Sequence, residues 1–337
     1  MISVIITCYN LEAYICEAIE SVLAQDYGGT YEILVIDDCS TDRSPCLIKQ
    51  YTQVAYHRTD QNSGVLLSTM LGLHCSSGEI IMFLDGDDVW ESSKMRLTKE
   101  CFDQNPTTAF VSHNLEFIDS KGIKIDKKSR ASEVLGAVNH GDWDLKIRRA
   151  ILLMLDYIWL GSAYAIRRSS SSISDFCKFV EARPSLANAY QDWPIAFWIA
   201  CDPCVTFGYI PAVLFSYRLH GANYSGDAST LPKFLRNLNR SLCTFALIRE
   251  IAKNNRCSPE IINAIELKIL YYNHLVAIYS SKKIEFRRIP SIMLKGGHGV
   301  VGLIREIVRY VLIRLIGPEK MIQLTNAVKV LKGWGGG

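Results

Sequence analysis

The sequence predicts an α/β fold whose sheet is mostly parallel, followed by a helical C-terminal region. In the first hundred residues, short apolar runs alternate with segments of helical periodicity, which is the pattern of βαβ units. Polar clusters follow three of these apolar runs, as expected where parallel strands end at a binding site. After about residue 231 the periodicity is helical almost throughout. These three observations together predict the fold class.

The N-terminal hundred residues are expected to supply four strands and two helices. Each apolar run has the length of a buried strand, and each helical segment repeats its apolar positions every three to four residues. Because helices connecting parallel strands form right-handed crossovers, these elements predict consecutive βαβ units. The expected strands are 3–6, 32–36, 54–57 and 79–84, and the expected helices are 13–23 and 65–75.

From about residue 105 the pattern is less regular. We expect short strands, one further helix and one solvated turn before the chain becomes helical. The expected strands are 110–113, 116–118, 161–166 and 213–217, the helix is 192–200 and the turn is 169–172. The change in pattern predicts two domains: a catalytic α/β domain over 1–228 and a helical, basic region over 229–337.

The composition is that of an ordered globular protein, with 49% hydrophobic and 21% charged residues. The net charge of +3 is too small to indicate a polyanionic partner, and no basic platform with interleaved aromatic residues predicts nucleic-acid binding. The eleven cysteines are irregularly spaced, which favours reduced thiols in a cytosol. No signal peptide and no run of about 18 apolar residues is visible, so we expect a cytoplasmic catalytic part.

Three carboxylates stand within four residues at Asp85-Gly86-Asp87-Asp88, directly after a buried strand. Like charges this close destabilise one another unless a cation compensates. Mn²⁺ or Mg²⁺ would do so by bridging one or two carboxylates to the phosphates of a nucleotide. The alternative is a polar turn in which Asp88 caps the next helix. A second acidic pair at Asp37-Asp38, also at a strand end, favours metal and nucleotide roles for Asp85 and Asp87.

Five segments occur in an order and spacing typical of a known family. They are 3–10 (SVIITCYN), 32–42 (EILVIDDCSTD), 62–64 (NSG), 78–88 (GEIIMFLDGDD) and 191–192 (QD). Over roughly residues 1–225 the chain resembles glycosyltransferase family 2, the inverting transferases with the GT-A fold. The resemblance implies transfer of a sugar from a nucleotide-diphospho-sugar to a glycan or lipid-linked acceptor, as in bacterial surface polysaccharide synthesis.

The resemblance also implies roles for the polar residues at the strand ends. Tyr9 would stack on the nucleobase, and Thr7, where relatives often carry proline, would line the same pocket. Asp38 would accept a hydrogen bond from the base. Asp85 would bind the ribose or the neighbouring nucleotide, and Asp87 would ligate the metal that bridges the diphosphate.

Asp192 is the candidate catalytic base. It stands at the start of a predicted helix, where the family places a carboxylate that takes the proton of the acceptor hydroxyl. A positioned base of this kind contributes about 10²–10⁴-fold to a rate. The alternative is a carboxylate that only stabilises the N-terminus of the helix through its dipole.

The segment Tyr217-Arg218-Leu219-His220, with Asn223 and Ser225, resembles the Y-R-x-H-x-x-N-x-S segment that closes the catalytic domain in many relatives. His220 would be a third metal ligand or a diphosphate contact, and the alternative is a loop histidine. Arg218 would clamp a phosphate, or it would only pair with a surface acid.

Three residues are candidates for the acceptor side of the site. Gly161 and Ser162 resemble the segment that precedes the acceptor site, where small residues let the backbone approach a sugar. Trp193 could offer an aromatic face to an acceptor ring, although a packed aromatic side chain is the alternative. One departure from the family is the segment 68–70 (STM), which stands where many relatives carry A-R-N and therefore lacks an arginine for the diphosphate.

The C-terminal region is strongly basic. Between residues 282 and 332, eleven Lys or Arg residues stand against three Glu residues. The segment 300–316 reads as an amphipathic helix that would lie in the membrane interface, so we expect peripheral binding to the inner face of the cell membrane. The alternatives are packing on the protein's own core or on a second copy in a homodimer.

Two other functions remain open at this level. A metal-dependent nucleotidyltransferase would also join carboxylates to nucleotide phosphates, but it would release pyrophosphate instead of a nucleoside diphosphate. A non-catalytic, membrane-bound assembly partner would have lost its site, which the carboxylates at 85, 87 and 192 speak against. A dinucleotide-binding dehydrogenase is disfavoured because no G-x-G-x-x-G follows the first strand.

Overall fold

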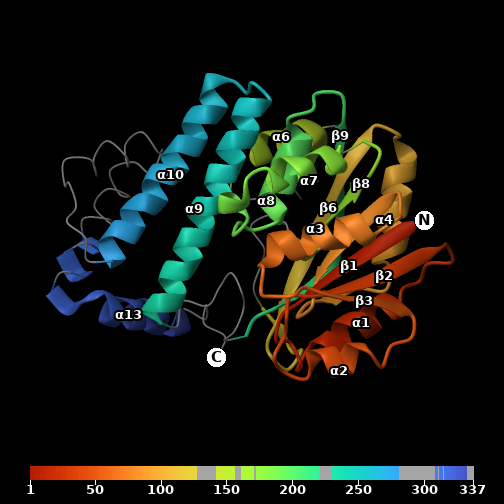
Figure 1. Cartoon of the computed structure of the whole chain (residues 1–337), viewed down its shortest axis with the longest axis horizontal. Helices are drawn as coiled ribbons and strands as arrows, with labels where there is room; N and C mark the ends of the chain where they lie inside the picture. The colour runs from red at the N-terminus through yellow and green to blue at the C-terminus, as the bar shows by residue number, and fades with distance from the viewer. Residues whose placement is uncertain are drawn as a thin grey trace. The chain divides into compact units, whose positions relative to one another are not determined.

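The structure is a computed structural model of the 337-residue chain. It describes residues 1–126, 142–155, 161–170, 172–220, 230–280, 308–309, 311–313 and 315–331. The chain divides into two compact units, Met1–Arg218 and Leu219–Gly337 (Figure 1). The expected domain boundary at residue 228 falls outside the described residues, as do Asn223 and Ser225.

Nine strands of the first unit's described residues form a single sheet. They are β1 (Ile2–Cys8), β2 (Tyr31–Asp37), β3 (Val54–Arg58), β4 (Ile80–Asp85), β5 (Val89–Trp90), β6 (Thr108–Ile118), β7 (Lys124–Ile125), β8 (Tyr164–Arg167) and β9 (Thr206–Arg218). Their order is β3-β2-β1-β4-β8-β6-β9-β5, with β7 paired to β6. Strands β5, β7 and β8 run against their neighbours and the others share one direction, so the mostly parallel sheet is confirmed.

The helices of this unit are α1 (Ile15–Leu23), α2 (Ser44–Ile48), α3 (Val65–Cys75), α4 (Lys94–Gln104), α6 (Trp143–Leu152), α7 (Ile173–Glu181) and α8 (Asp192–Ala200). The chain runs outward from β1 to β3 and then returns past β1 to β4. Because right-handed crossovers change face when the direction reverses, α1 and α2 lie on one face of these strands and α3 lies on the other (Figure 1). The reversal occurs between β1 and β4, and ligands of such sheets bind where the direction reverses.

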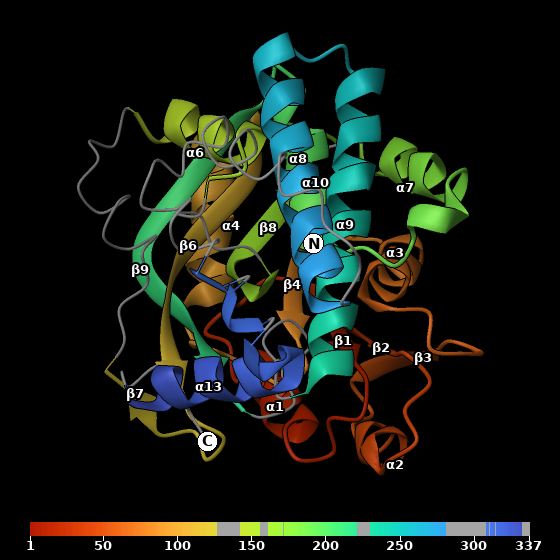
Figure 2. The ribbon, with the colours of Figure 1, turned by 90° about the vertical axis from the view of Figure 1, so that its left-hand side faces the viewer.

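Most predicted elements match observed ones, and 65–75 and 192–200 match α3 and α8 residue for residue. The two strands expected at 110–113 and 116–118 are instead one strand, β6, paired in parallel with the long β9 (Figure 2). The pairing shifts register on both sides of Asn114, whose side chain bonds to Pro211 O (3.1 Å) and accepts a hydrogen bond from Tyr209. A bulge therefore accommodates a buried polar residue that the sequence pattern suggests as a strand break.

The prediction of a strand over 161–166 is wrong in its first half. Gly161–Ala163 forms a single 3₁₀ turn, and strand β8 begins only at Tyr164. Gly161 has φ +68°, a left-handed conformation that does not continue a strand. The turn brings Ser162 against the loop that follows β4.

The described part of the second unit is helical, as predicted. Its helices are α9 (Leu231–Asn254), α10 (Pro259–Tyr279) and α13 (Pro318–Leu331). Residues 255–258 separate α9 from α10, and Ser258 caps α10 by accepting a hydrogen bond from Ile261 N at 3.5 Å. No helix among the described residues has both the length and the apolar character needed to cross a membrane.

Candidate active site

The first element of the site is the contact between the ends of β1 and β4. These parallel strands pair so that Thr7 stands opposite Asp85, and the Thr7 hydroxyl donates to Asp85 Oδ1 at 3.2 Å. Gly86 N donates to Thr7 O at 2.9 Å, and a Cβ on Gly86 would lie 2.8 Å from that same oxygen. Gly86 therefore lets the acidic loop fold closely over β1, and the structure brings Thr7 and Asp85 together.

Asp88 connects the acidic loop to two other parts of the sheet. Its carboxylate is buried and accepts hydrogen bonds from Ser162 Oγ (2.7 Å) and from Arg218 N (3.0 Å). The alternative prediction that Asp88 caps the next helix is wrong, because α4 begins only at Lys94 and both carboxylate oxygens are bonded elsewhere. Asp88 holds the loop in place, while Asp85 and Asp87 remain half-buried.

The side chain of Ser162 supports the acidic loop. Its side chain is buried, and its hydroxyl accepts from Asp85 N (2.9 Å) while donating to Asp88. Gly161 lies on the other side of the same turn, where a Cβ would stand 3.5 Å from Asp85 Oδ2. The acceptor-side roles of Gly161 and Ser162 stay predictions.

Arg218 is also part of the support of the site, which corrects its expected role as a phosphate clamp. Its side chain is 1% exposed. The guanidinium donates to Asp87 O (2.8 Å), to Asp119 O (3.3 Å) and to the Glu17 carboxylate (2.5 Å). These buried contacts hold the acidic loop against α1 and β9, so the charge of Arg218 is directed toward protein groups.

The charge of Asp87 raises the pKa values of its neighbours Asp85 and Asp88. Burial, together with the nearby charges of Asp87 and Asp192, raises the pKa of Asp85 to about 7, while the Thr7 hydrogen bond opposes the shift. Burial and the charges of Asp87 and Asp85 likewise raise the pKa of Asp88. A site that gathers negative charge in this way favours a bound cation.

Asp192 lies at the N-terminus of α8 and faces this cluster, close enough for its charge to act on Asp85 and on the buried Tyr164. Its Oδ1 accepts the backbone N–H of Trp193 at 2.8 Å, which favours the ionised form. Burial outweighs that contact and raises the pKa of Asp192 to about 6. A carboxylate with this pKa is ionised at neutral pH and can still accept a proton, as a general base must.

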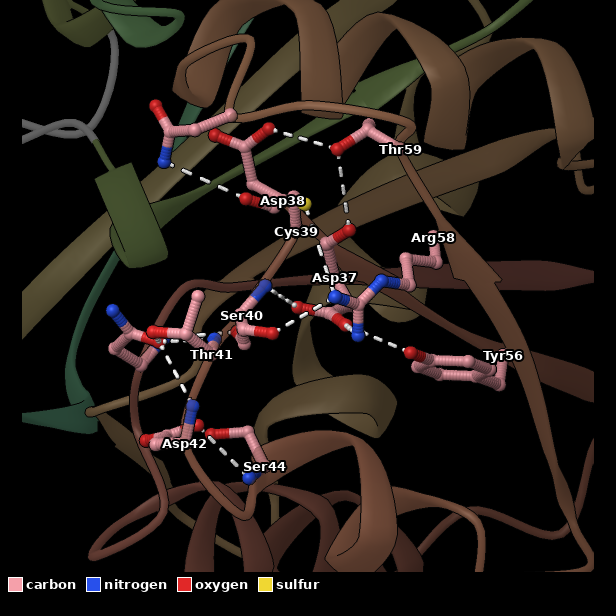
Figure 3. A network of polar contacts seen from close by, with 12 residues as sticks. Asp37, Asp38, Cys39, Ser40, Thr41, Asp42, Ser44, Tyr56, Arg58 and Thr59 are labelled. Atoms are coloured by element: carbon pink, nitrogen blue, oxygen red, sulfur yellow. Dashed lines mark hydrogen bonds and ion pairs between the residues drawn. The ribbon is translucent and has the colours of Figure 1, made fainter.

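The two acidic residues at the end of β2, Asp37 and Asp38, have different structural roles (Figure 3). Asp37 is fully buried and accepts from Tyr56 Oη (2.7 Å), Arg58 (3.1 Å) and Ser40 N (2.8 Å). Asp38 accepts from the backbone N–H groups of the turn that precedes α3. Its donors are Ser63 N (2.7 Å), Gly64 N (2.8 Å) and Thr59 Oγ1 (3.1 Å). Asp38 therefore shapes the loops at this strand end, and its expected contact with a nucleobase stays a prediction.

The remaining predicted site residues are Tyr9, Trp193 and His220. Tyr9, just beyond β1, is 41% exposed, so its ring is accessible for stacking. Trp193 is half-buried in the first turn of α8. His220 is half-buried two residues beyond the end of β9 and belongs to the second unit, so its metal role stays a prediction.

Sequence reasoning missed two buried residues of this region, Lys94 and Tyr164. Lys94 is buried with Met95, Thr98 and Phe102 on one face of α4. The sequence carries one sign of this burial. Lys94, Thr98 and Phe102 are spaced four residues apart, which places the lysine on the apolar face of a helix. Tyr164 opens β8 and stacks on Phe83 at 4.7 Å, and the sequence pattern reveals only that it is apolar and buried.

The comparisons with known proteins identify the family and the fold. Residues 3–151 match the family model described as glycosyl transferase family 2. An uncharacterized glycosyltransferase of Nostoc sp. is 30% identical over 245 residues, which cover 68% of this chain and 68% of that protein. Escherichia coli WfgD is named as a UDP-Glc:alpha-D-GlcNAc-diphosphoundecaprenol beta-1,3-glucosyltransferase. It is 30% identical over 125 residues, or 36% of this chain and 49% of that protein.

The fold is similar to that of a solved structure, S. aureus TarS 1-349 in complex with UDP-GlcNAc. The TM-score is 0.55 at 16% sequence identity, and the match covers 87% of this chain and 79% of that one. At this low identity the structural match supports the fold alone, whereas the family model and the Nostoc relative show the family. The chain therefore belongs to glycosyltransferase family 2, and it is a glycosyltransferase with the GT-A fold.

Proposed function

We propose that this glycosyltransferase is inverting and metal-dependent, and that it moves a sugar from a nucleotide-diphospho-sugar to a glycan or lipid-linked acceptor in surface polysaccharide synthesis. The observation that carries the proposal is the position of Asp192 at the start of α8, close enough to Asp85 for its charge to raise the pKa of that residue. One carboxylate able to take a proton thus stands near carboxylates suited to a nucleotide and its metal.

Asp192 acts as the base in this proposal. The acceptor hydroxyl gives its proton to the Asp192 carboxylate while its oxygen attacks the anomeric carbon on the face opposite the diphosphate. The bond from that carbon to the diphosphate oxygen breaks, and the nucleoside diphosphate leaves with the electron pair. The hydrogen bond from Trp193 N at 2.8 Å fixes the carboxylate for this step.

The residues present fit a divalent cation. Asp85 and Asp87 offer hard oxygen ligands, and a cation would neutralise the charges of Asp87 and Asp192, which add to burial in raising the pKa of Asp85. Among the described residues, no three His, Cys, Asp or Glu side chains form a complete metal cage. Mn²⁺ and Mg²⁺ commonly bind through one or two carboxylates together with substrate phosphates. When bound, the ion would stabilise the charge that develops on the leaving diphosphate.

The donor would occupy the edge formed by the ends of β1, β2 and β4. In this proposal the exposed ring of Tyr9 stacks on the base, Thr7 and Asp38 line its pocket, and Asp85 contacts the ribose. Gly161 and Trp193 are the acceptor-side candidates, and His220 is the candidate third metal ligand. The names of WfgD and of the TarS complex, with UDP-Glc and UDP-GlcNAc, support a uridine diphosphate sugar as the first donor to test.

A panel of nucleotide sugars tests the proposal. With Mn²⁺ present, at least one UDP-sugar is expected to stabilise the protein. A ligand at 100 times its Kd adds about 2.7 kcal/mol to the free energy of unfolding. The measurement is the thermal midpoint with each compound, followed by analysis of the product released with an acceptor. Release of UDP supports the proposal, whereas stabilisation by nucleoside triphosphates alone with release of pyrophosphate would contradict it.

We also propose that the C-terminal region holds the enzyme on the inner face of the membrane, where a lipid-linked acceptor would lie. Most of the segment 300–316 lies outside the described residues, but Val308 (50%), Val311 (44%) and Leu315 (74%) are described and exposed. Leu315→Glu combined with Val308→Glu is expected to reduce binding to phosphatidylglycerol vesicles about tenfold in a sedimentation assay. The control is Ile123→Glu, because Ile123 is 62% exposed in the catalytic unit. Equal binding of both variants would contradict membrane docking. It would favour the alternative that these side chains contact a second copy of the chain in a homodimer.

A further inference from the structure

A lysine is buried directly beneath the acidic loop. Lys94 is the first residue of α4 and is 1% exposed. Both features disfavour a cation, since burial removes its hydration and the N-terminus of a helix carries partial positive charge. A lysine in such a position needs compensating partners, and these partners show what the residue does.

Burial lowers the pKa of Lys94 well below its ordinary value, and the nearby charge of Asp88 opposes that shift. The ammonium donates a hydrogen bond to the backbone carbonyl of Ser162. It also lies over the ring of Trp90, 4.2 Å from the centroid, and 5.4 Å from that of Phe215, which gives two cation–π contacts. The neighbouring His113 is fully buried, and its pKa is lowered by burial and by the charge of Lys94, so it stays neutral.

Ser162 links Lys94 to the acidic loop. While its carbonyl accepts from Lys94, its hydroxyl accepts from Asp85 N (2.9 Å) and donates to Asp88 Oδ2 (2.7 Å). One serine thus connects the buried ammonium to both ends of the sequence Asp85–Asp88. The 3₁₀ turn that carries Ser162 also carries Gly161, so the same contact holds the acceptor-side backbone beside Asp85.

We propose that Lys94 is a positioning residue for the donor: acting through Ser162, its ammonium sets the place of the Asp85–Asp88 loop on which nucleotide and metal binding depend. This inference rests on the proposed function. The carboxylate of Asp88 lies close enough for its charge to oppose the lowering of the Lys94 pKa, while the guanidinium of Arg218 pairs with Glu17. Lys94 therefore contacts no substrate and takes part in no bond that forms or breaks.

A double-mutant cycle on nucleotide binding tests the proposal. The variants are Lys94→Met, Ser162→Ala and the two combined, and the probe is UDP with Mn²⁺, measured by calorimetry on the full chain. Lys94→Met and Ser162→Ala are each expected to weaken UDP binding about tenfold. The double variant is expected to lose little more than either single one, because both act on the same link. Lys99→Met is the matched control on α4, where Lys99 pairs with Asp103 at the surface.

Kinetic constants separate positioning from a general loss of folded protein. A smaller folded fraction lowers the apparent kcat and leaves both KM values unchanged, whereas displacement of the loop raises the donor KM about tenfold and leaves the acceptor KM unchanged. If Lys94→Met does not fold, Lys94→Gln is measured in its place. Donor affinity within twofold of the wild type in the Lys94 variant, or additive losses in the cycle, would overturn the proposal.

Failure of the proposed function gives a different result. In that case the wild-type protein itself binds no nucleotide with Mn²⁺. The link between Lys94 and Ser162 is then tested by urea unfolding of the wild type, the two single variants and the double variant. The changes in the free energy of unfolding caused by the two single substitutions should not add in the double variant. Additive changes in the free energy of unfolding would contradict a link between Lys94 and Ser162, whatever the protein binds.

Discussion

Asp192→Asn is expected to lower the rate of sugar transfer by about 10²–10⁴-fold, the usual contribution of a positioned general base. The amide has the same shape and can still accept the hydrogen bond of Trp193 N, now 2.8 Å from Asp192 Oδ1, but it cannot take the proton of the acceptor hydroxyl. Donor affinity should stay within about twofold of the wild type. The measurements are the steady-state kcat and a separate titration of UDP with Mn²⁺.

Asp175→Asn is the matched control for this variant. Asp175 also stands in the first turn of a nine-residue helix, α7, but it pairs with Lys178 at the surface. The control should retain the wild-type rate. If Asp192→Asn also keeps that rate, or if it mainly loses donor affinity, Asp192 is only a helix-end carboxylate and the proposed base is wrong.

The same assignment predicts the pH dependence of transfer. The groups that face Asp192 are Asp85 at the end of β4 and Tyr164 on β8, and burial raises the pKa of Asp192 to about 6. Because a base must be ionised, kcat/KM should fall tenfold per pH unit below about pH 6. A bound cation would stabilise the carboxylate, so the corresponding fall in kcat should lie at lower pH.

Asp85→Asn is expected to weaken binding of UDP with Mn²⁺ by about 10–100-fold and at the same time to stabilise the protein without ligand. The pKa of Asp85 is raised to about 7, so the folded state holds this proton more tightly than the unfolded chain does. The charged carboxylate therefore costs stability as the pH rises through the range from about 4 to 7. Removing it should add about 1–2 kcal/mol to the free energy of unfolding at pH 8.

The pH dependence of this gain distinguishes it from a simple packing effect. Below about pH 4 the wild-type carboxyl is protonated in both states, so the stabilisation by Asp85→Asn should disappear there. Asp37→Asn is the matched control at the end of β2. Asp37 accepts hydrogen bonds from Tyr56, Ser40 and Arg58, so its replacement should destabilise the fold by about 1–3 kcal/mol. Urea unfolding at pH 8 and pH 4 measures both variants, and a destabilised Asp85→Asn at pH 8 would refute the expectation.

Much of the fold could be predicted because it depends on local periodicity. Helices α3 and α8 match their predicted ranges, and the acidic clusters stand at the ends of β2 and β4, where the pattern of apolar runs places them. The strand pattern alone could not locate the continuous β6 or the turn at Gly161. Both depend on partners distant in the sequence, namely β9 and the acidic loop.

By itself the sequence determined that Thr7 and Asp85 lie at one edge of the sheet, because parallel strands end there, whereas Asp192 was predicted through the family resemblance. The tertiary structure decided which polar residues remain on the open side. It buried Ser162, Arg218 and Lys94 behind the acidic loop and left Asp85 and Asp87 half-buried. The physical reason is that burial and hydrogen-bond partners arise from contacts between distant segments.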